Sequence, residues 1–537
     1  MKSAKTPKTS KKALRNLGVA AAATLAFASA TEARATGFTD IGDDLRTHVK
    51  TLYELHGAFR LRGEMFYNMD LDRGPTPSGQ LFFPVPLSDP KGQTLTAADM
   101  RFRTDLAVYA PGGMVAAKVR LDMPDNLALG AYPDGVPSAS TTQRPPEFTA
   151  RLKRAYTEVL TPIGVFAAGR MGAHWGLGML TNGGDCVDCD SGDSADRVAF
   201  ISPIAGHVFA VAFDLSSSGP FTKRGVQNKV VDLDPSDDVR SVTFALLNFR
   251  NDLARERRRK AGKTTFEYGA FASYRWQERD TPLWYLPTSS DTVYKSSQVM
   301  NRGFSATALD AWFRLSLPFG RIELEGAVLF AHYDQASLLP GALLRRPVDS
   351  LQWGAAIESE FGRPESDFGA GLDLGIASGD PAPGFGVTQD AFAKQPKKGD
   401  LDGPQSNPPV DNRADNFRFH PDYRIDRILF REIIGTVTDA VYLRPHMRYT
   451  LVDLGNSKVT FSLAGIASFA MEATSAPGGQ SPLGIELDPT LAYRHDDGFG
   501  FALEHAVLFP LAGLDNVELN LKAQPAQLLR ARASYVF

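Results

Sequence analysis

The stretch DAWFRLSLPFGRIELEGAVLF, residues 310–330, decides the fold of this chain. Before the Pro318-Phe319-Gly320 turn, the apolar residues of the segment 304–317 alternate with polar ones, and after the turn the segment 321–333 does the same. A two-residue period predicts a β-strand with two different faces. Two such strands joined by a Pro- and Gly-containing turn predict an antiparallel hairpin. One face of each strand suits lipid and the other suits water, as the wall of a membrane β-barrel requires.

The same pattern recurs along the rest of the chain. We expect strands near 54–68, 99–110, 114–122, 150–160, 163–172, 196–202, 206–215, 239–249, 263–276, 304–317, 321–333, 350–361, 367–377, 439–453, 457–471, 484–494, 498–509 and 527–537. Tight turns alternate with long polar connections at 69–98, 123–149, 173–195, 216–238, 277–303, 334–350 and 378–438. Short turns on one side and long loops on the other are typical of outer-membrane barrels. Loops of this length are uncommon in compact soluble domains.

The fold prediction is therefore an all-β transmembrane antiparallel barrel of about 18 strands, spanning 54–537, with short periplasmic turns and long extracellular loops. Counts of 16 or 20 strands are the alternatives. The segment 424–435 is assigned to a loop because its apolar residues follow a helical spacing. The basic stretch 250–262 is expected to be a solvated turn. Helical membrane spans are excluded, because beyond the N-terminus the chain has no run of 18 consecutive apolar residues.

The N-terminus reads as a secretory signal peptide over residues 1–35. Six basic residues precede an apolar run, 17–28, which leads to Ala33-Arg34-Ala35 and cleavage before Thr36. The alternative, a membrane anchor, suits the run less well because a span needs about 20 residues. Residues 36–53 would form a periplasmic N-terminal segment. The full chain has net charge −3, and without the signal peptide it has −9, which gives no reason to expect nucleic-acid binding.

The C-terminal strand carries a family signal. Apolar or aromatic residues at every second position from Leu529 lead to Tyr535 and the final Phe537, and arginines stand between them. This ending resembles the β-signal of outer-membrane proteins, which the barrel assembly machinery reads in that family. The chain thus resembles outer-membrane β-barrel porins. Its arginine-rich polar faces and long loops look like the alginate-export type of barrel, and Tyr423–Glu432 is similar to segments of uncharacterised deltaproteobacterial porin-like proteins.

The strand faces predict a charged lumen. The candidate pore-lining residues are Arg101, Arg103, Lys118, Arg120, Arg170, Arg314, Arg444, Arg448, Arg530 and Arg532, opposed by Asp105, Asp122, Asp310, Glu323, Glu325, Glu358 and Glu360. Arginine rings lower the barrier for anions. The alternative is that these charges pair across strands and line a wet pore. We therefore expect an outer-membrane channel for polar solutes, with anions and saccharides as candidates. A barrel whose loops serve adhesion, structure or surface binding is the second hypothesis.

The loops hold the remaining candidate sites. Cys186 and Cys189 are expected to form a local disulfide, with free thiols or redox chemistry as alternatives. We expect two acidic groups to be solvated. One surrounds these cysteines and consists of Asp185, Asp188, Asp190, Asp193 and Asp196, and the other lies at 232–238. Oxygen-rich loops can hold Ca²⁺ and bridge to lipopolysaccharide, but neither group has EF-hand spacing. Trp175 fits an interfacial aromatic position, and the loop 378–415 is a candidate for folding inward as a constriction.

No cofactor and no enzymatic activity are expected. The sequence contains no G-x-S-x-G, H-E-x-x-H or P-loop motif, and neither His446 nor His505 has sequence neighbours that would complete a catalytic site. The expected partners are outer-membrane lipids and lipopolysaccharide, the barrel assembly machinery, and small polar or anionic solutes.

Overall fold

The computed structural model of the chain describes residue 41 and residues 50–88, 93–130, 149–224, 229–281, 299–336, 346–363, 365–382, 397–401 and 412–537. The expected signal peptide, 1–35, lies outside these residues, as does most of the segment 36–53. In the described part, no helix is both long enough and apolar enough to cross a membrane.

Eighteen strands form the wall of the molecule. They are β1 (Leu52–Tyr67), β2 (Thr94–Tyr109), β3 (Val115–Asp122), β5 (Arg151–Thr161), β6 (Gly164–Gly172), β7 (Ser194–Ile204), β8 (His207–Ser216), β11 (Val239–Asn248), β12 (Thr265–Asp280), β13 (Met300–Leu317), β14 (Gly320–Tyr333), β15 (Val348–Phe361), β16 (Phe368–Ala377), β17 (Ala440–Asp453), β18 (Ser457–Ala470), β19 (Pro482–His495), β20 (Phe499–Pro510) and β21 (Ala526–Val536). The two-residue β4 (Leu127–Ala128) adds to the edge of β2, and β9 (Phe221–Arg224) pairs with β10 (Lys229–Asp232) as a separate hairpin.

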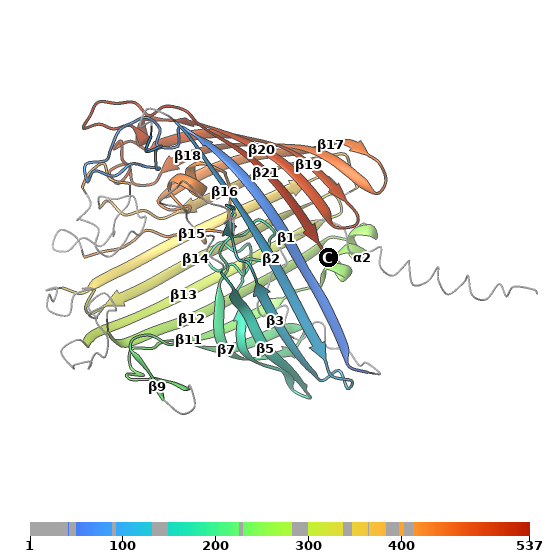
Figure 1. Ribbon diagram of the computed structural model, residues 1–537. Helices are drawn as coiled ribbons and strands as arrows, with labels where there is room; N and C mark the ends of the chain where they lie inside the picture. The colour runs from blue at the N-terminus through green and yellow to red at the C-terminus, as the bar shows by residue number, and fades with distance from the viewer. Residues whose placement is uncertain are drawn as a thin grey trace, which may run out of the picture.

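Every wall strand pairs antiparallel with its neighbour in the chain, and β1 pairs with both β2 and β21. The sheet therefore closes on itself, which leaves no unpaired backbone edge facing lipid. All 18 strands expected from the sequence are present, so the predicted fold is confirmed. In Figure 1 the long connections gather at one end of the barrel, and the C-terminus and α2 (Asp252–Lys260) lie at the other.

The two-residue period places apolar side chains outside and polar ones inside. On β13, Leu309 and Phe313 are 46% and 42% exposed, whereas Asp310 and Trp312, one position along, are 4% and 6% exposed. Exposed Leu, Phe, Val and Tyr side chains recur on the outward face of almost every wall strand. An apolar belt of that extent is far larger than a water-soluble monomer exposes. The wall is thus a transmembrane barrel.

The chain terminus completes the closure. The backbone N–H of Phe537 donates to the carbonyl of Gly57 at 3.1 Å, and the N–H of Gly57 donates to the carbonyl of Phe537 at 3.0 Å. A Cβ atom at Gly57 would lie 2.6 Å from Cζ of the Phe537 ring, so only glycine leaves room for that ring. The ring stacks on Phe102 and Tyr535, at 5.9 Å between centroids in each case.

The basic connection 250–262 is a helix rather than the expected turn. The side chain of Asn251 caps α2 by accepting from the N–H of Ala254 at 3.0 Å, which satisfies one of the free donors of the first turn. Two of its arginines pair outside the helix: Arg255 with Glu267 of β12 at 3.4 Å, and Arg259 with Glu365 of the β15–β16 turn at 2.5 Å. The positive charge of this stretch is therefore partly compensated at the short-turn end.

The interior of the barrel contains protein. An apolar cluster joins inward wall residues such as Tyr442 to Phe417, Phe419, Ile428 and Leu429 of the connection between β16 and β17. These five side chains are less than 2% exposed. A π-helical turn, η3 (Leu429–Ile433), belongs to this connection, and a short 3₁₀ turn, η4 (Ala512–Leu514), follows β20. The helical spacing of 424–435 was therefore a correct reason to leave it out of the wall.

Candidate functional site: two chain segments inside the barrel

The connection between β6 and β7, residues 173–193, runs across the lumen, and we call it the crossing segment. Its first half is fixed to the wall formed by β12, β13 and β14. The indole Nε1 of Trp175 donates to Asp310 at 2.8 Å, and its ring meets Phe271 edge to face at 5.0 Å. The carboxylate of Glu325 accepts from the backbone N–H groups of Leu177 and Leu180. Trp175 is 5% exposed, so the expectation of an interfacial aromatic was wrong.

The second half of the crossing segment reaches the opposite wall. Cys186 and Cys189 form a disulfide, and the tight loop they close turns its carbonyl groups toward β2. The guanidinium group of Arg101 donates to the carbonyls of Cys186, Val187 and Cys189. Arg103 donates to the carbonyl of Gly184 at 2.6 Å while its other nitrogens hold Asp122 at 2.7 and 2.8 Å. Buried carbonyls thus find donors on the wall, as buried polar groups require.

The carboxylates of the crossing segment are held by arginines. Asp188 lies 3.3 Å or less from nitrogens of Arg62, Arg424, Arg431 and Arg532, which come from β1, the β16–β17 connection and β21. Although burial opposes ionisation, the guanidinium groups of Arg431, Arg532 and Arg424 hold the pKa of Asp188 well below its usual range. Asp188 is therefore a charged centre of an ion-pair network that spans three separate parts of the chain.

Neighbouring acids extend this network. Asp190 pairs with Arg62 at 3.0 Å and with Arg424 at 2.7 Å, and against the effect of burial Arg424, Arg62 and Arg60 lower its pKa. Asp185 pairs with Arg154 of β5 at 2.7 Å and also with Arg120 of β3. The expectation that this acidic group is solvated was wrong for Asp185, Asp188 and Asp190, because their carboxylates are the partners of inward-facing arginines, whereas Asp193 and Asp196 keep 42% and 52% of their side chains exposed. The sequence could not reveal this pairing, since the partners lie up to several hundred residues away.

A second stretch, residues 412–439 between β16 and β17, also lies inside the barrel, and we call it the inner segment. The carboxylate of Glu486 on β19 accepts from the backbone N–H groups of Arg427 and Ile428 at 2.8 Å and of Leu429 at 3.1 Å. This arrangement satisfies the free donors at the start of the π-helical turn. Asp426 accepts from the N–H groups four and five residues further on, at Phe430 and Arg431.

The two segments bind each other. The carboxylate of Asp422 in the inner segment accepts from the N–H groups of Asp190 at 3.0 Å and Ser191 at 2.9 Å in the crossing segment. The N–H of His420 donates to the carbonyl of Met179 at 2.7 Å. Together they join β1, β2, β3 and β5 to β12, β13, β14 and β19 through the middle of the lumen. The expected inward loop, 378–415, lies mostly outside the described residues, and the segments that narrow the lumen are 173–193 and 412–439.

The structure gathers some of the candidate pore-lining residues around the two segments. Arg101, Arg103, Arg120, Arg530, Arg532 and Glu325 all contact them. Arg530 is 0% exposed and lies between Glu64 at 2.5 Å, Glu432 at 3.1 Å and Glu504 at 3.7 Å. Arg60 and Arg62 lie on the predicted polar face of the segment 54–68, where they alternate with the outward Phe59 and Leu61, but they are missing from the candidate pore-lining residues.

Candidate residues also pair with acidic residues of the inner wall. Arg314 lies 3.8 Å from Glu323, Arg444 lies 2.6 Å from Asp373, and Arg448 lies 3.0 Å from Glu360. These arginines keep 14%, 27% and 28% of their side chains exposed. Lys118 lies 3.3 Å from Glu158, and Arg120 from the neighbouring Asp105 at 2.5 Å. Cross-strand pairing of charges is thus widespread inside the barrel.

Arg170 is a correction to the candidate set. It shares the outward face of β6 with Phe166, which is 48% exposed, whereas Ala167 and Met171 face inward and are 1% and 3% exposed. Its guanidinium group holds Asp196 of β7 at 2.7 and 2.8 Å, and both side chains are about half exposed. Because a one-residue shift of register exchanges the two faces of a strand, the glycine-rich β6 was easily assigned to the wrong face.

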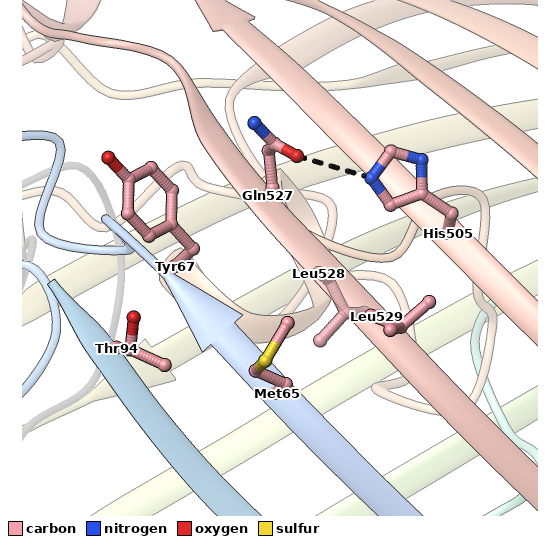
Figure 2. A pocket seen from close by; sticks show the side chains of 7 residues that line it. All are labelled: Met65, Tyr67, Thr94, His505, Gln527, Leu528 and Leu529. Atoms are coloured by element: carbon pink, nitrogen blue, oxygen red, sulfur yellow. Dashed lines mark hydrogen bonds between the residues drawn. The ribbon is translucent and has the colours of Figure 1, made fainter.

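A hollow on the outer face of the wall is a separate feature (Figure 2). It has a volume of about 410 Å³ and crosses β2, β1, β21 and β20 toward their long-loop ends. Met65 and Leu529 supply apolar surface, and Nε2 of His505 lies 3.3 Å from Oε1 of Gln527. All these side chains belong to the outward face, so the hollow faces lipid and is not part of the lumen.

The closed 18-stranded wall, apolar outside and charged inside, defines a transmembrane β-barrel of the outer-membrane type. No protein-family model and no characterised protein matches the sequence. Among solved structures, OccK11 (OpdR) of Pseudomonas aeruginosa matches at 10% identity and a TM-score of 0.44, over 92% of this chain and 98% of that chain. A BenF-like porin from Pseudomonas fluorescens Pf-5 matches at 9% and 0.43, over 90% and 98%. OpdK of Pseudomonas aeruginosa with vanillate matches at 11% and 0.42, over 90% and 98%.

These likenesses are too low to say anything about the solutes of this chain. The resemblance to alginate-export barrels finds no support among them and stays a prediction.

Proposed function

We propose that this protein is an outer-membrane channel for small polar solutes, exported through a cleaved signal peptide. The observation that carries the proposal is the charged, arginine-rich lumen crossed by two fixed segments. A barrel of 16–18 strands is wide enough for an aqueous channel. The crossing and inner segments narrow that width, so the passage admits small solutes and excludes large ones. Nothing in this arrangement requires a catalytic group or a cofactor.

The finer proposal is a preference for anions. Around the two segments, arginines and carboxylates largely compensate each other, so the preference must come from cations that lack an acidic partner. Arg494 on β19 faces inward near the short-turn end and is exposed, and no ion pair to it occurs among the described residues. It lies close enough to Arg532 for the two charges to repel. Arg532 is paired with Asp188 and Glu504, so Arg494 is the cation available to a solute, and its guanidinium group favours carboxylate or phosphate over a cation.

The test is the rate of solute entry into liposomes that contain the purified protein. We expect small neutral and acidic sugars to enter, and we expect an acidic sugar to enter faster than a neutral sugar of the same size. Arg494→Gln is expected to reduce the entry of the acidic sugar and leave the neutral one unchanged. Arg170→Gln is the matched control, because it removes the same charge from the outer face. Equal loss in both variants would contradict the anion proposal, and no entry of any solute would favour a structural or adhesive barrel.

Assembly is proposed to depend on the C-terminal residues. Tyr535 and Phe537 face outward on the last strand, where the assembly machinery would contact them before the barrel closes. Phe537→Ala leaves the backbone hydrogen bonds to Gly57 available, so we expect slower assembly of a barrel that is normal once formed. The amount of folded protein in the outer-membrane fraction of cells measures this. Unchanged assembly would contradict it.

A further inference from the structure

Three carboxylates converge at the long-loop end of the barrel, far from the two inner segments. Asp232 ends β10, and Asp237 and Asp238 immediately precede β11. One carboxylate oxygen from each residue lies within 4.8 Å of the others. Acidic clusters on loops are common and usually solvated, so their proximity alone indicates nothing. The state of the middle carboxylate distinguishes this cluster.

Asp237 is buried without a partner for its charge. Its side chain is 0% exposed, and neither carboxylate oxygen has a hydrogen-bond partner. The nearby amide of Gln277 donates to the backbone carbonyl of Asp237 at 2.7 Å instead. Gly219 packs directly against the carboxylate, and a Cβ there would lie 1.8 Å from Oδ2. A buried carboxylate that receives no hydrogen bond destabilises the fold unless a proton or a cation binds it.

The charged groups around Asp237 further disfavour a negative charge on its carboxylate. Asp232, Asp234, Asp238 and Asp280 all place negative charge near the Asp237 carboxylate. Of the nearby arginines, Arg302 is paired with Asp280, and Arg240 donates to the carbonyl of Pro235 at 2.6 Å. Asp238 accepts one hydrogen bond, from the N–H of Ser218 at 3.2 Å. The cluster therefore has an excess of negative charge and spare oxygen lone pairs.

We propose that Asp232, Asp237 and Asp238 bind one calcium ion. Ca²⁺ takes six to eight oxygen ligands at about 2.3–2.6 Å, so oxygens bound to one ion lie at most about 5 Å apart, and the three carboxylate oxygens of this cluster lie within 4.8 Å of one another. Mg²⁺ requires oxygens at about 2.0–2.1 Å and a regular octahedron, which three carboxylates on two strand ends supply less readily. Water and loop carbonyls would complete the sphere.

The ion would join two parts of the rim. Asp232 belongs to the β9–β10 hairpin, whereas Asp237 and Asp238 are continuous with the wall strand β11. One ion bound to all three would fix the hairpin to the mouth of the barrel. In Figure 1 this hairpin, labelled β9, extends from the wall at the end that carries the long connections. Calcium binding is thus expected to order the rim without changing the wall.

The experiment is calorimetric titration of CaCl₂ into the folded, chelator-treated protein in detergent. We expect one saturable site per chain in the wild type. Asp237→Asn is expected to weaken binding at least about ten-fold, since it removes a ligand charge. Asp497→Asn is the matched control, because Asp497 is 85% exposed in a turn at the opposite end, and its affinity should equal that of the wild type. Parallel titration with MgCl₂ should show weaker binding.

A second variant and a second measurement keep the proposal testable if Asp237→Asn fails to fold. Asp238→Asn should weaken binding in the same way, and calcium should slow proteolytic cleavage within 216–238 of the wild type only. The proposal is overturned if the wild type shows no saturable binding up to about 10 mM Ca²⁺, well above the range of weak extracellular sites. It is also overturned if Asp237→Asn and Asp238→Asn both bind calcium like the wild type.

Discussion

Asp188→Asn is the change that tests the inner architecture most sharply. The substitution keeps the shape of the side chain but removes the one charge shared by Arg62, Arg424, Arg431 and Arg532. Removing one partner of a buried ion pair costs about 3–5 kcal/mol, because the remaining charges are left uncompensated. Asp188 keeps 17% of its side chain exposed, and Arg62 and Arg424 retain Asp190 as a partner, so we expect the lower end of that range, about 3 kcal/mol.

An energy of about 3 kcal/mol changes the ratio of docked to undocked crossing segment by about two powers of ten. We therefore expect single channels of Asp188→Asn to show a larger or strongly fluctuating conductance in planar bilayers. The far-ultraviolet circular dichroism should stay that of the wild-type barrel, because the wall strands do not depend on this residue. Loss of the barrel itself would mean that the network supports the wall and not only the segment.

Asp196→Asn is the matched control. Its partner Arg170 lies on the outer face, and the two side chains are 52% and 45% exposed. An exposed pair of this kind contributes about 0–1 kcal/mol. Its conductance should match that of the wild type. If Asp188→Asn and Asp196→Asn give indistinguishable single-channel records, the reasoning about the crossing segment is refuted.

Three further predictions follow from the same contacts. The pKa values of Asp188 and Asp190 are lower in the docked state than the unfolded value of about 3.9, so these ionised carboxylates stabilise the docked state above that pH, and the stabilisation is lost as pH falls through the lower pKa values of the docked state. Conductance should therefore be constant from pH 8 to about 4 and change only below it. A change near pH 6 would contradict this. Replacing both Cys186 and Cys189 by Ser should destabilise the crossing segment by at most about 2 kcal/mol, because the closed loop is short, and raise the noise of the open channel; a silent channel would contradict it. Arg530→Met should lower the midpoint of heat-induced unfolding on gels, because it removes the buried cation that Glu64, Glu432 and Glu504 share. A midpoint equal to that of Arg170→Met would exclude this role.

The wall could be predicted from the sequence because the pattern that defines each strand lies within that strand. Each strand alternates on its own, as on 310–330, and each turn is marked by its Gly, Pro, Asn or Asp residues. Lipid contact makes the alternation unusually clear, since outward positions must be apolar. β6 is the instructive failure: with three glycines among its nine residues, the alternation is weak, and Arg170 was placed on the wrong face.

The interior could not be predicted because its contacts join residues that are far apart in the sequence. Nothing in the sequence near Asp188 indicates that arginines from residues 62 to 532 surround it. A run of aspartates around two cysteines looks the same whether it faces water or a lumen full of guanidinium groups. The inner segment gave a partial signal, because its apolar residues follow a helical spacing in a chain whose described residues include no helix that could span a membrane. A loop with a buried apolar face is one that folds inward.

The central claim is that this barrel conducts polar solutes through a lumen narrowed by its own chain. The direct measurement is the current through the purified wild-type protein in a planar bilayer, with the reversal potential recorded across a KCl gradient. We predict discrete conductance steps and a reversal potential on the chloride side of zero. A correctly folded protein that inserts and carries no current would contradict the channel, and a reversal potential on the potassium side would contradict its preference for anions.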